Sequence, residues 1–120
     1  MINKYSSLEL RTIKLNPTLF DEIILSSLSQ IEYIYLSSNT TLNQEQIHCL
    51  FMLNIDGVNI NLLRNRICPK ERIEQFLHLN DKIYNITIAH NPTLDQSTIN
   101  TLKKLDDPDV NMSLTLTFPE

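Results

Sequence analysis

The chain has 120 residues, which fits one domain, and its side chains are mainly branched aliphatics and amides: 19 leucines, 15 isoleucines and 13 asparagines against one glycine. The single glycine excludes glycine-rich phosphate loops and most folds built on tight two-residue hairpins, because both need residues with positive φ. The net charge is -4 and the isoelectric point is near 5.3, so the chain lacks the excess of basic residues that is typical of nucleic-acid-binding proteins. We therefore expect no nucleic-acid partner.

The sequence predicts a cytoplasmic location for the protein. No apolar run approaches the ~18 residues that span a bilayer, and residues 1–7 lack the apolar stretch of a signal peptide. We therefore expect no contact with a membrane. Cys49 and Cys68 have no CxxC spacing, and we expect free, mostly buried thiols.

Four segments that begin with asparagine divide the chain into repeats. Their steps are 23, 26 and 26 residues, and the asparagines are Asn16, Asn39, Asn65 and Asn91. Self-similarity at such a period is typical of arrays of stacked supersecondary elements. We expect one solenoid domain over 1–120, with an N-terminal cap at 1–15, repeats at about 16–38, 39–64, 65–90 and 91–116, and a second cap formed by the last residues.

The first half of each repeat predicts a helix, because apolar residues recur at steps of three. They lie eight, eleven and fourteen residues after the asparagine: Ile47, Ile73 and Ile99, then Leu50, Phe76 and Leu102, then Leu53, Leu79 and Leu105. The first repeat has a shorter version of this pattern. Thr18, Thr41 and Thr93 each precede a polar residue by three positions, which predicts threonine caps at the helix starts. In the third repeat we expect Pro69 to be the first helical residue.

The second half of each repeat allows two interpretations. Residues 58–62, 84–88 and 110–114 alternate apolar and polar side chains, which is typical of a half-buried strand. Alternatively, each is a short helix with 3₁₀ character. An aspartate before each stretch favours the helix start.

The repeated asparagines have a structural explanation. An asparagine in a turn hydrogen-bonds nearby backbone and tolerates left-handed φ. We expect Asn16, Asn39, Asn65 and Asn91 to serve in this way, in positions where other proteins use glycine.

The last full repeat carries a family resemblance. The run from Tyr84 to Leu94, with its Asn-Pro before a capped helix, is followed by Leu102 to Leu105 and then by Asp106-Asp107-Pro108-Asp109-Val110. This run resembles the leucine-rich repeat variant family, and the resemblance extends over roughly 11–117. It implies a mainly α, short right-handed α-solenoid of about four repeats, each a helix paired with a shorter 3₁₀ helix. The arginine common after the valine in that family is asparagine here, at Asn59, Asn85 and Asn111.

Histidine and cysteine offer one candidate chemistry. His48 and Cys49 are adjacent and so diverge by about 100° on a helix, which suits two ligands of one metal poorly. We expect no metal, no cofactor and no catalytic residue. A small metal-dependent or thiol-dependent enzyme using His48, Cys49, Cys68 or His78 is the alternative.

The acidic residues offer a second candidate, a surface that binds a partner. If the repeats stack, their carboxylates align along one edge of the solenoid. These carboxylates could cap the second element of each repeat, bind a partner, or do both. The residues are Glu32, Asp56, Asp81, Asp106, Asp107 and Asp109.

Short solenoids usually act by presenting a surface to another macromolecule. The acidic balance then predicts a non-enzymatic inhibitor of a basic protein, most concretely an immunity protein or antitoxin that neutralises a nuclease toxin. An adaptor module without inhibitory activity is the alternative. The oligomeric state stays open.

Overall fold

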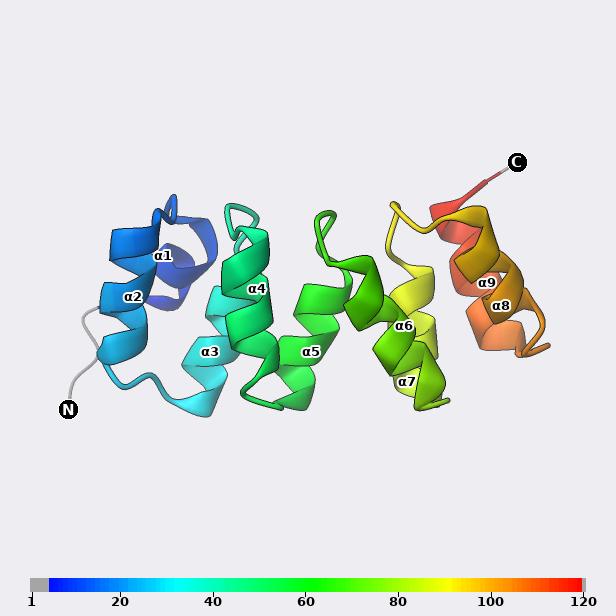
Figure 1. The fold of residues 1–120 in the computed structure, drawn as a ribbon, viewed down its shortest axis with the longest axis horizontal. Coiled ribbons are helices and arrows are strands. Elements are labelled where there is room, and N and C mark those ends of the chain that lie inside the picture. The colour runs from blue at the N-terminus through cyan, green and yellow to red at the C-terminus, as the bar shows by residue number, and fades with distance from the viewer. Residues whose placement is uncertain (1–4, 120) are drawn as a thin grey trace. The chain divides into compact units, whose positions relative to one another are not determined.

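A computed structural model describes residues 5–119; the first four residues of the expected N-terminal cap, and Glu120, lie outside this range. The described residues form nine helices and no strand, so the mainly α prediction is confirmed (Figure 1). None of these helices has the length and apolar character needed to cross a membrane. The helices are α1 Ser7–Thr12, α2 Pro17–Leu25, α3 Gln30–Ser37, α4 Gln44–Phe51, α5 Asp56–Leu63, α6 Lys70–His78, α7 Lys82–Ala89, α8 Gln96–Lys103 and α9 Pro108–Thr117.

The chain falls into two units, residues 1–62 and 63–120, and the boundary between them in the sequence lies near the end of α5. In the first unit, α1 packs on α3, and α3 contacts α4. In the second unit, α7 packs mainly on α9, while α6 contacts α7 and α8 contacts α9. Each unit buries its own aliphatic residues, including Leu10, Leu36 and Ile47 in the first and Ile88, Leu102 and Val110 in the second.

The second half of each repeat is a short α-helix, so the helix interpretation is confirmed, whereas the strand interpretation and the expected 3₁₀ character are wrong. The burial pattern gives the reason. Val110 and Leu114, four residues apart, are buried, whereas Met112 between them is 65% exposed. A strand would place all three side chains on one face, but a helix brings only positions i and i+4 together. Asp81 and Asp107 cap α7 and α9 as the sequence predicted.

The threonine caps are wrong, because the helices α4 and α8 begin later than expected. Asn43 and Asp95 are their N-caps and accept hydrogen bonds from backbone N–H groups three residues on, as an N-cap does. Thr18 lies inside α2, which Asn16 caps. Likewise Pro69 is the N-cap of α6 rather than its first helical residue.

Two of the asparagines form a motif that we call the asparagine clamp: Asn39 with Thr41, and Asn91 with Thr93. In the second, Asn91 Nδ2 donates to the carbonyls of Leu63 and Asn65 at 2.7 and 3.2 Å. Asn91 Oδ1 accepts from the N–H and the hydroxyl of Thr93 at 2.8 and 2.6 Å. The first clamp has the same pattern, with the carbonyls of Leu10 and Ile13 as acceptors. Each clamp therefore joins its turn to backbone 26 residues earlier.

The prediction that these asparagines hydrogen-bond nearby backbone is confirmed, but the prediction of left-handed φ is wrong. Positive φ instead occurs where the first helix of each repeat ends, at Ser27, Asn54, Asn80 and Asp106. The N–H groups of Asn54, Asn80 and Asp106 donate to carbonyl groups at the helix ends, where a residue in the left-handed conformation is common. The glycine, Gly57, is helical, and a Cβ there would lie 2.6 Å from Ile34 Cδ1. The packing of the Ile34 side chain of α3 against this position, and not a turn, accounts for the glycine.

The leucines fourteen residues after Asn39, Asn65 and Asn91 do not belong to the buried helix face that their spacing predicts. The side chains are exposed by 38% at Leu53, 61% at Leu79 and 39% at Leu105. All three lie just beyond the last residue of a first helix, where the chain turns. The apolar residues therefore recur every three positions even beyond the last residue of the helix.

Candidate functional site

The predicted partner-binding carboxylates of the second unit lie at the starts of α7 and α9. Asp81 is the N-cap of α7 and accepts from the N–H of Tyr84 at 3.1 Å. Asp107 caps α9 and accepts from the N–H groups of Asp109 and Val110. Asp106 precedes it with φ of 53°. The capping role therefore holds at two of these positions.

The two predicted carboxylates of the first unit also lie in first turns. Glu32 is the third residue of α3, and its carboxylate accepts from the N–H of Ser29 at 2.8 Å. Ser29 in turn accepts from the N–H of Glu32, which completes a capping box. Asp56 is the first residue of α5. Negative charge in the first turn of a helix is favourable, so each has a structural role.

Lys82 is a basic residue that the sequence reasoning did not place at this surface. Its Nζ lies 2.8 Å from Asp109 Oδ2 and 3.8 Å from Asp107 Oδ2, so it joins the start of α7 to the start of α9. The Asp109 hydrogen bond, followed by the charges of both aspartates, raises the pKa of Lys82. The structure thus brings Asp107 and Asp109 together on one cation, which partly neutralises them.

Exposed apolar side chains accompany these carboxylates. Leu79 and Leu105 lie at equivalent positions of the last two repeats, each two residues before the aspartate that caps the following helix. We call Leu79, Asp81, Leu105 and Asp106 the acidic loop surface. All four residues are exposed, so the surface combines apolar contact area with negative charge.

A second cation in this unit also joins successive repeats. Lys70, at the start of α6, lies 2.5 Å from Oδ2 of Asp95, the N-cap of α8. The Lys70 hydrogen bond, followed by hydrogen bonds from Thr98, lowers the pKa of Asp95 from the usual 3.8 to about 2. Folding therefore favours the charged form of the Asp95 side chain. The stabilisation that it contributes is present above about pH 4 and is lost as the pH falls toward 2.

Replacing Lys70 with methionine should raise the pKa of the Asp95 carboxyl from about 2 toward 3.8, because the largest cause of its lowering is removed. The measurement is an NMR titration of the aspartate side-chain carboxyl carbon. Lys104→Met, which removes an exposed lysine outside this pair, serves as the control and should leave the Asp95 titration unchanged. An Asp95 pKa that stays near 2 in the Lys70 variant would contradict the pairing.

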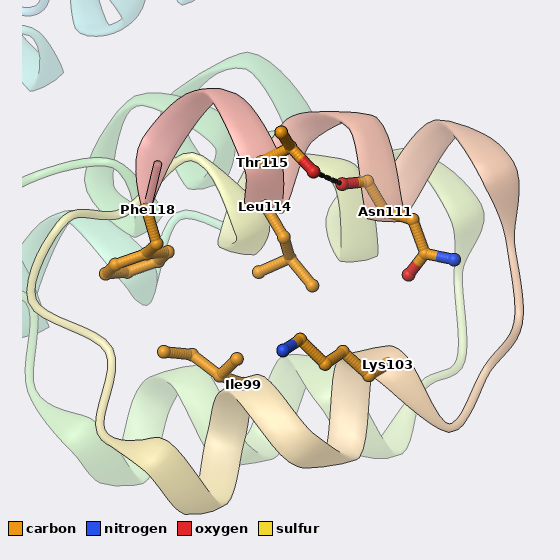
Figure 2. A pocket seen from close by; sticks show the side chains of 6 residues that line it. All are labelled: Ile99, Lys103, Asn111, Leu114, Thr115 and Phe118. Atoms are coloured by element: carbon orange, nitrogen blue, oxygen red, sulfur yellow. Dashed lines mark hydrogen bonds between the residues drawn. The ribbon is translucent and has the colours of Figure 1, made fainter. Parts of the chain in front are cut away.

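The sequence did not predict the groove that lies between α8 and α9. Its volume is about 530 Å³, and it lies within the second unit (Figure 2). Ile99 and Lys103 come from α8, and the facing wall comes from α9 and the residue that follows it. The facing residues are Asn111, Leu114, Thr115 and Phe118. No signal in the sequence marks this groove, because Ile99 and Leu114 belong to the same periodic stripes as the buried core.

The histidines and cysteines of the described residues belong to no group of potential metal ligands. No group of three or more histidine, cysteine or acidic side chains within residues 5–119 could hold a metal ion. Cys68 is buried, and burial raises the pKa of its thiol to about 12, which makes it a poor nucleophile. Cys49 is exposed, so the expectation of mostly buried thiols is wrong for that residue.

Comparisons with protein-family models, with curated proteins and with solved structures find no match to this chain. The resemblance to the leucine-rich repeat variant family therefore stays a prediction from the sequence motifs.

Proposed function

We propose that this chain is a non-enzymatic protein-binding module, built as a short right-handed α-solenoid similar to the leucine-rich repeat variant family. The solenoid is supported by the asparagine clamps. Asn91 binds the carbonyl of Asn65, its equivalent one repeat earlier, and Asn39 binds the carbonyl of Ile13, three residues before its own equivalent, Asn16. Contacts that recur at the repeat length are what stacked repeats require.

The partner that fits best is a basic protein, and the proposed role is that of a small acidic inhibitor. An immunity protein or antitoxin that blocks a nuclease toxin is its most concrete form. The observation that carries this proposal is the acidic loop surface. There, exposed Leu79 and Leu105 supply apolar area, while Asp81 and Asp106 supply charge. Negative charge beside apolar side chains favours fast association with a basic partner, and desolvation of the leucines supplies affinity.

The test uses the product of the neighbouring gene as partner, measured by co-purification, by binding kinetics and by inhibition of its activity. In the variant Asp81→Asn/Asp106→Asn we expect the association rate at low salt to fall about tenfold. Asparagine keeps both local structures, because it is a good N-cap and tolerates positive φ. The change therefore removes charge from the acidic loop surface without removing a helix cap.

The control is Asp21→Asn/Glu45→Gln, which removes the same charge from exposed positions of α2 and α4. It should leave the association rate close to that of the unmodified protein. Equal losses in the two double variants would show that only net charge matters, and would contradict the proposed surface. A retained partner whose activity is unchanged would identify an adaptor instead of an inhibitor.

A further inference from the structure

The groove between α8 and α9 has the dimensions of a small-molecule site. Its volume of about 530 Å³ lies within the range of about 300–1,000 Å³ typical of ligand pockets. Figure 2 shows side chains of the two helices facing one another across open space, with Ile99 and Lys103 on one wall and Leu114 and Phe118 on the other. Three of these four side chains are apolar.

Lys103 is the charged residue of the groove. Figure 2 shows its side chain extending along the α8 wall with Nζ toward the side where Ile99 and Leu114 lie. Whereas Lys70 and Lys82 form ion pairs, Lys103 forms none with the described residues. Lys103 is exposed at the groove, so its ammonium group is available to form a charge-assisted hydrogen bond with an anion bound there.

The remaining polar groups of the groove are uncharged. The hydroxyl of Thr115 donates to the carbonyl of Asn111 at 3.0 Å, so its proton is already used. The side-chain amide of Asn111 extends from the α9 wall (Figure 2). The groove therefore offers one cation and one amide.

We propose that this groove binds a small amphipathic monocarboxylate. Its carboxylate would pair with Lys103, and its apolar tail would contact Ile99, Leu114 and Phe118. A phosphate or a polyanion fits less well, because the groove holds one lysine and no arginine, and the chain as a whole carries a charge of -4. This site shares no lining residue with the acidic loop surface and does not depend on the proposed inhibitor role.

The test measures binding of octanoate, 1-octanol and octylamine to the full chain by backbone amide NMR titration. These probes share one apolar tail and differ in the charge of the head group. We expect octanoate to shift the amide signals of α8 and α9 and to bind about tenfold more tightly than octanol, because only the carboxylate can form a charge-assisted hydrogen bond with Lys103. Octylamine should bind most weakly.

Two lysine variants separate a specific site from general charge attraction. Lys103→Met keeps the apolar stem of the side chain and should reduce octanoate affinity about tenfold, to that of octanol. Lys104→Met removes the neighbouring exposed charge, which does not line the groove, and should leave affinity unchanged. Equal effects of the two variants, or equal binding of octanoate and octanol, would overturn the proposal. So would α8 and α9 signals that change on dilution without octanoate, because a second copy of the chain would then occupy the groove.

Discussion

Replacing Asn91 by alanine should lower the free energy of unfolding by about 3 kcal/mol, because the substitution leaves the buried carbonyl of Leu63 and the half-buried carbonyl of Asn65 without a donor. Asn91 is fully buried, and its amide donates to two backbone carbonyls while its oxygen accepts from the N–H and hydroxyl of Thr93. An alanine methyl group replaces none of these bonds. Urea denaturation followed by circular dichroism measures the change.

The third repeat provides a matched control for this experiment. Asn65 is at the equivalent position, but it is only half-buried and its oxygen accepts from the N–H of Ile67. Ile67 replaces the threonine of the clamp, so the side-chain hydroxyl is missing. We expect Asn65→Ala to cost about 1 kcal/mol. Asn39→Ala should behave like Asn91→Ala, since Asn39 has the full clamp and is fully buried.

A further variant tests the direction of the hydrogen bonds. In Asn91→Asp, the charged carboxylate cannot donate to the carbonyls of Leu63 and Asn65 and would be buried beside them. It should therefore destabilise the protein at least as much as alanine at neutral pH. If Asn91→Ala and Asn65→Ala cost the same, the clamp does not contribute the stability assigned to it.

The clamps show why the repeat could be found from the sequence while its helix boundaries could not. The tetrapeptide Asn-Pro-Thr-Leu occurs at Asn16 and again at Asn91. The first copy begins a helix at once, with Asn16 as N-cap and Pro17 as the first helical residue. In the second copy the asparagine side chain is used on distant backbone, and the helix begins only at Gln96.

Identical local sequence thus leads to two local structures because the surroundings of the asparagine differ. Asn16 is exposed, so its side chain is available to cap its own helix. Asn91 is buried against carbonyls that lie 26 and 28 residues earlier, and burying those carbonyls without partners would be costly. Periodicity predicts that a turn is there, but only the tertiary structure decides which backbone groups need the amide.

The candidate site could be predicted to a similar extent. The capping aspartates Asp81 and Asp107 follow from a short-range rule and were found. The Lys82 pair with Asp107 and Asp109 depends on residues 25 and 27 positions apart, and the α8–α9 groove depends on how two helices are spaced. Neither of these depends on local spacing, so the sequence did not indicate them.

Leu102→Ala should lower the free energy of unfolding by about 3 kcal/mol, since it removes a fully buried side chain from α8 and leaves a cavity. The paired variant is Leu105→Ala, three residues further along the same apolar period. Leu105 lies beyond the end of α8 and is 39% exposed, so its removal should cost only about 0.5 kcal/mol. Denaturant unfolding of both variants, with comparison of their midpoints and slopes, measures the difference.

The two leucines also separate stability from the proposed function. Leu105 belongs to the acidic loop surface, so Leu105→Ala should weaken binding of the proposed basic partner while the fold stays intact. At the partner surface a truncated leucine loses the apolar area that desolvation would have buried, and an effect of about tenfold on the dissociation constant corresponds to about 1.4 kcal/mol. Leu102→Ala instead should affect binding only through the fraction of unfolded protein. If Leu105→Ala costs as much stability as Leu102→Ala, the leucine is part of the core and the acidic loop surface loses one of its two apolar residues.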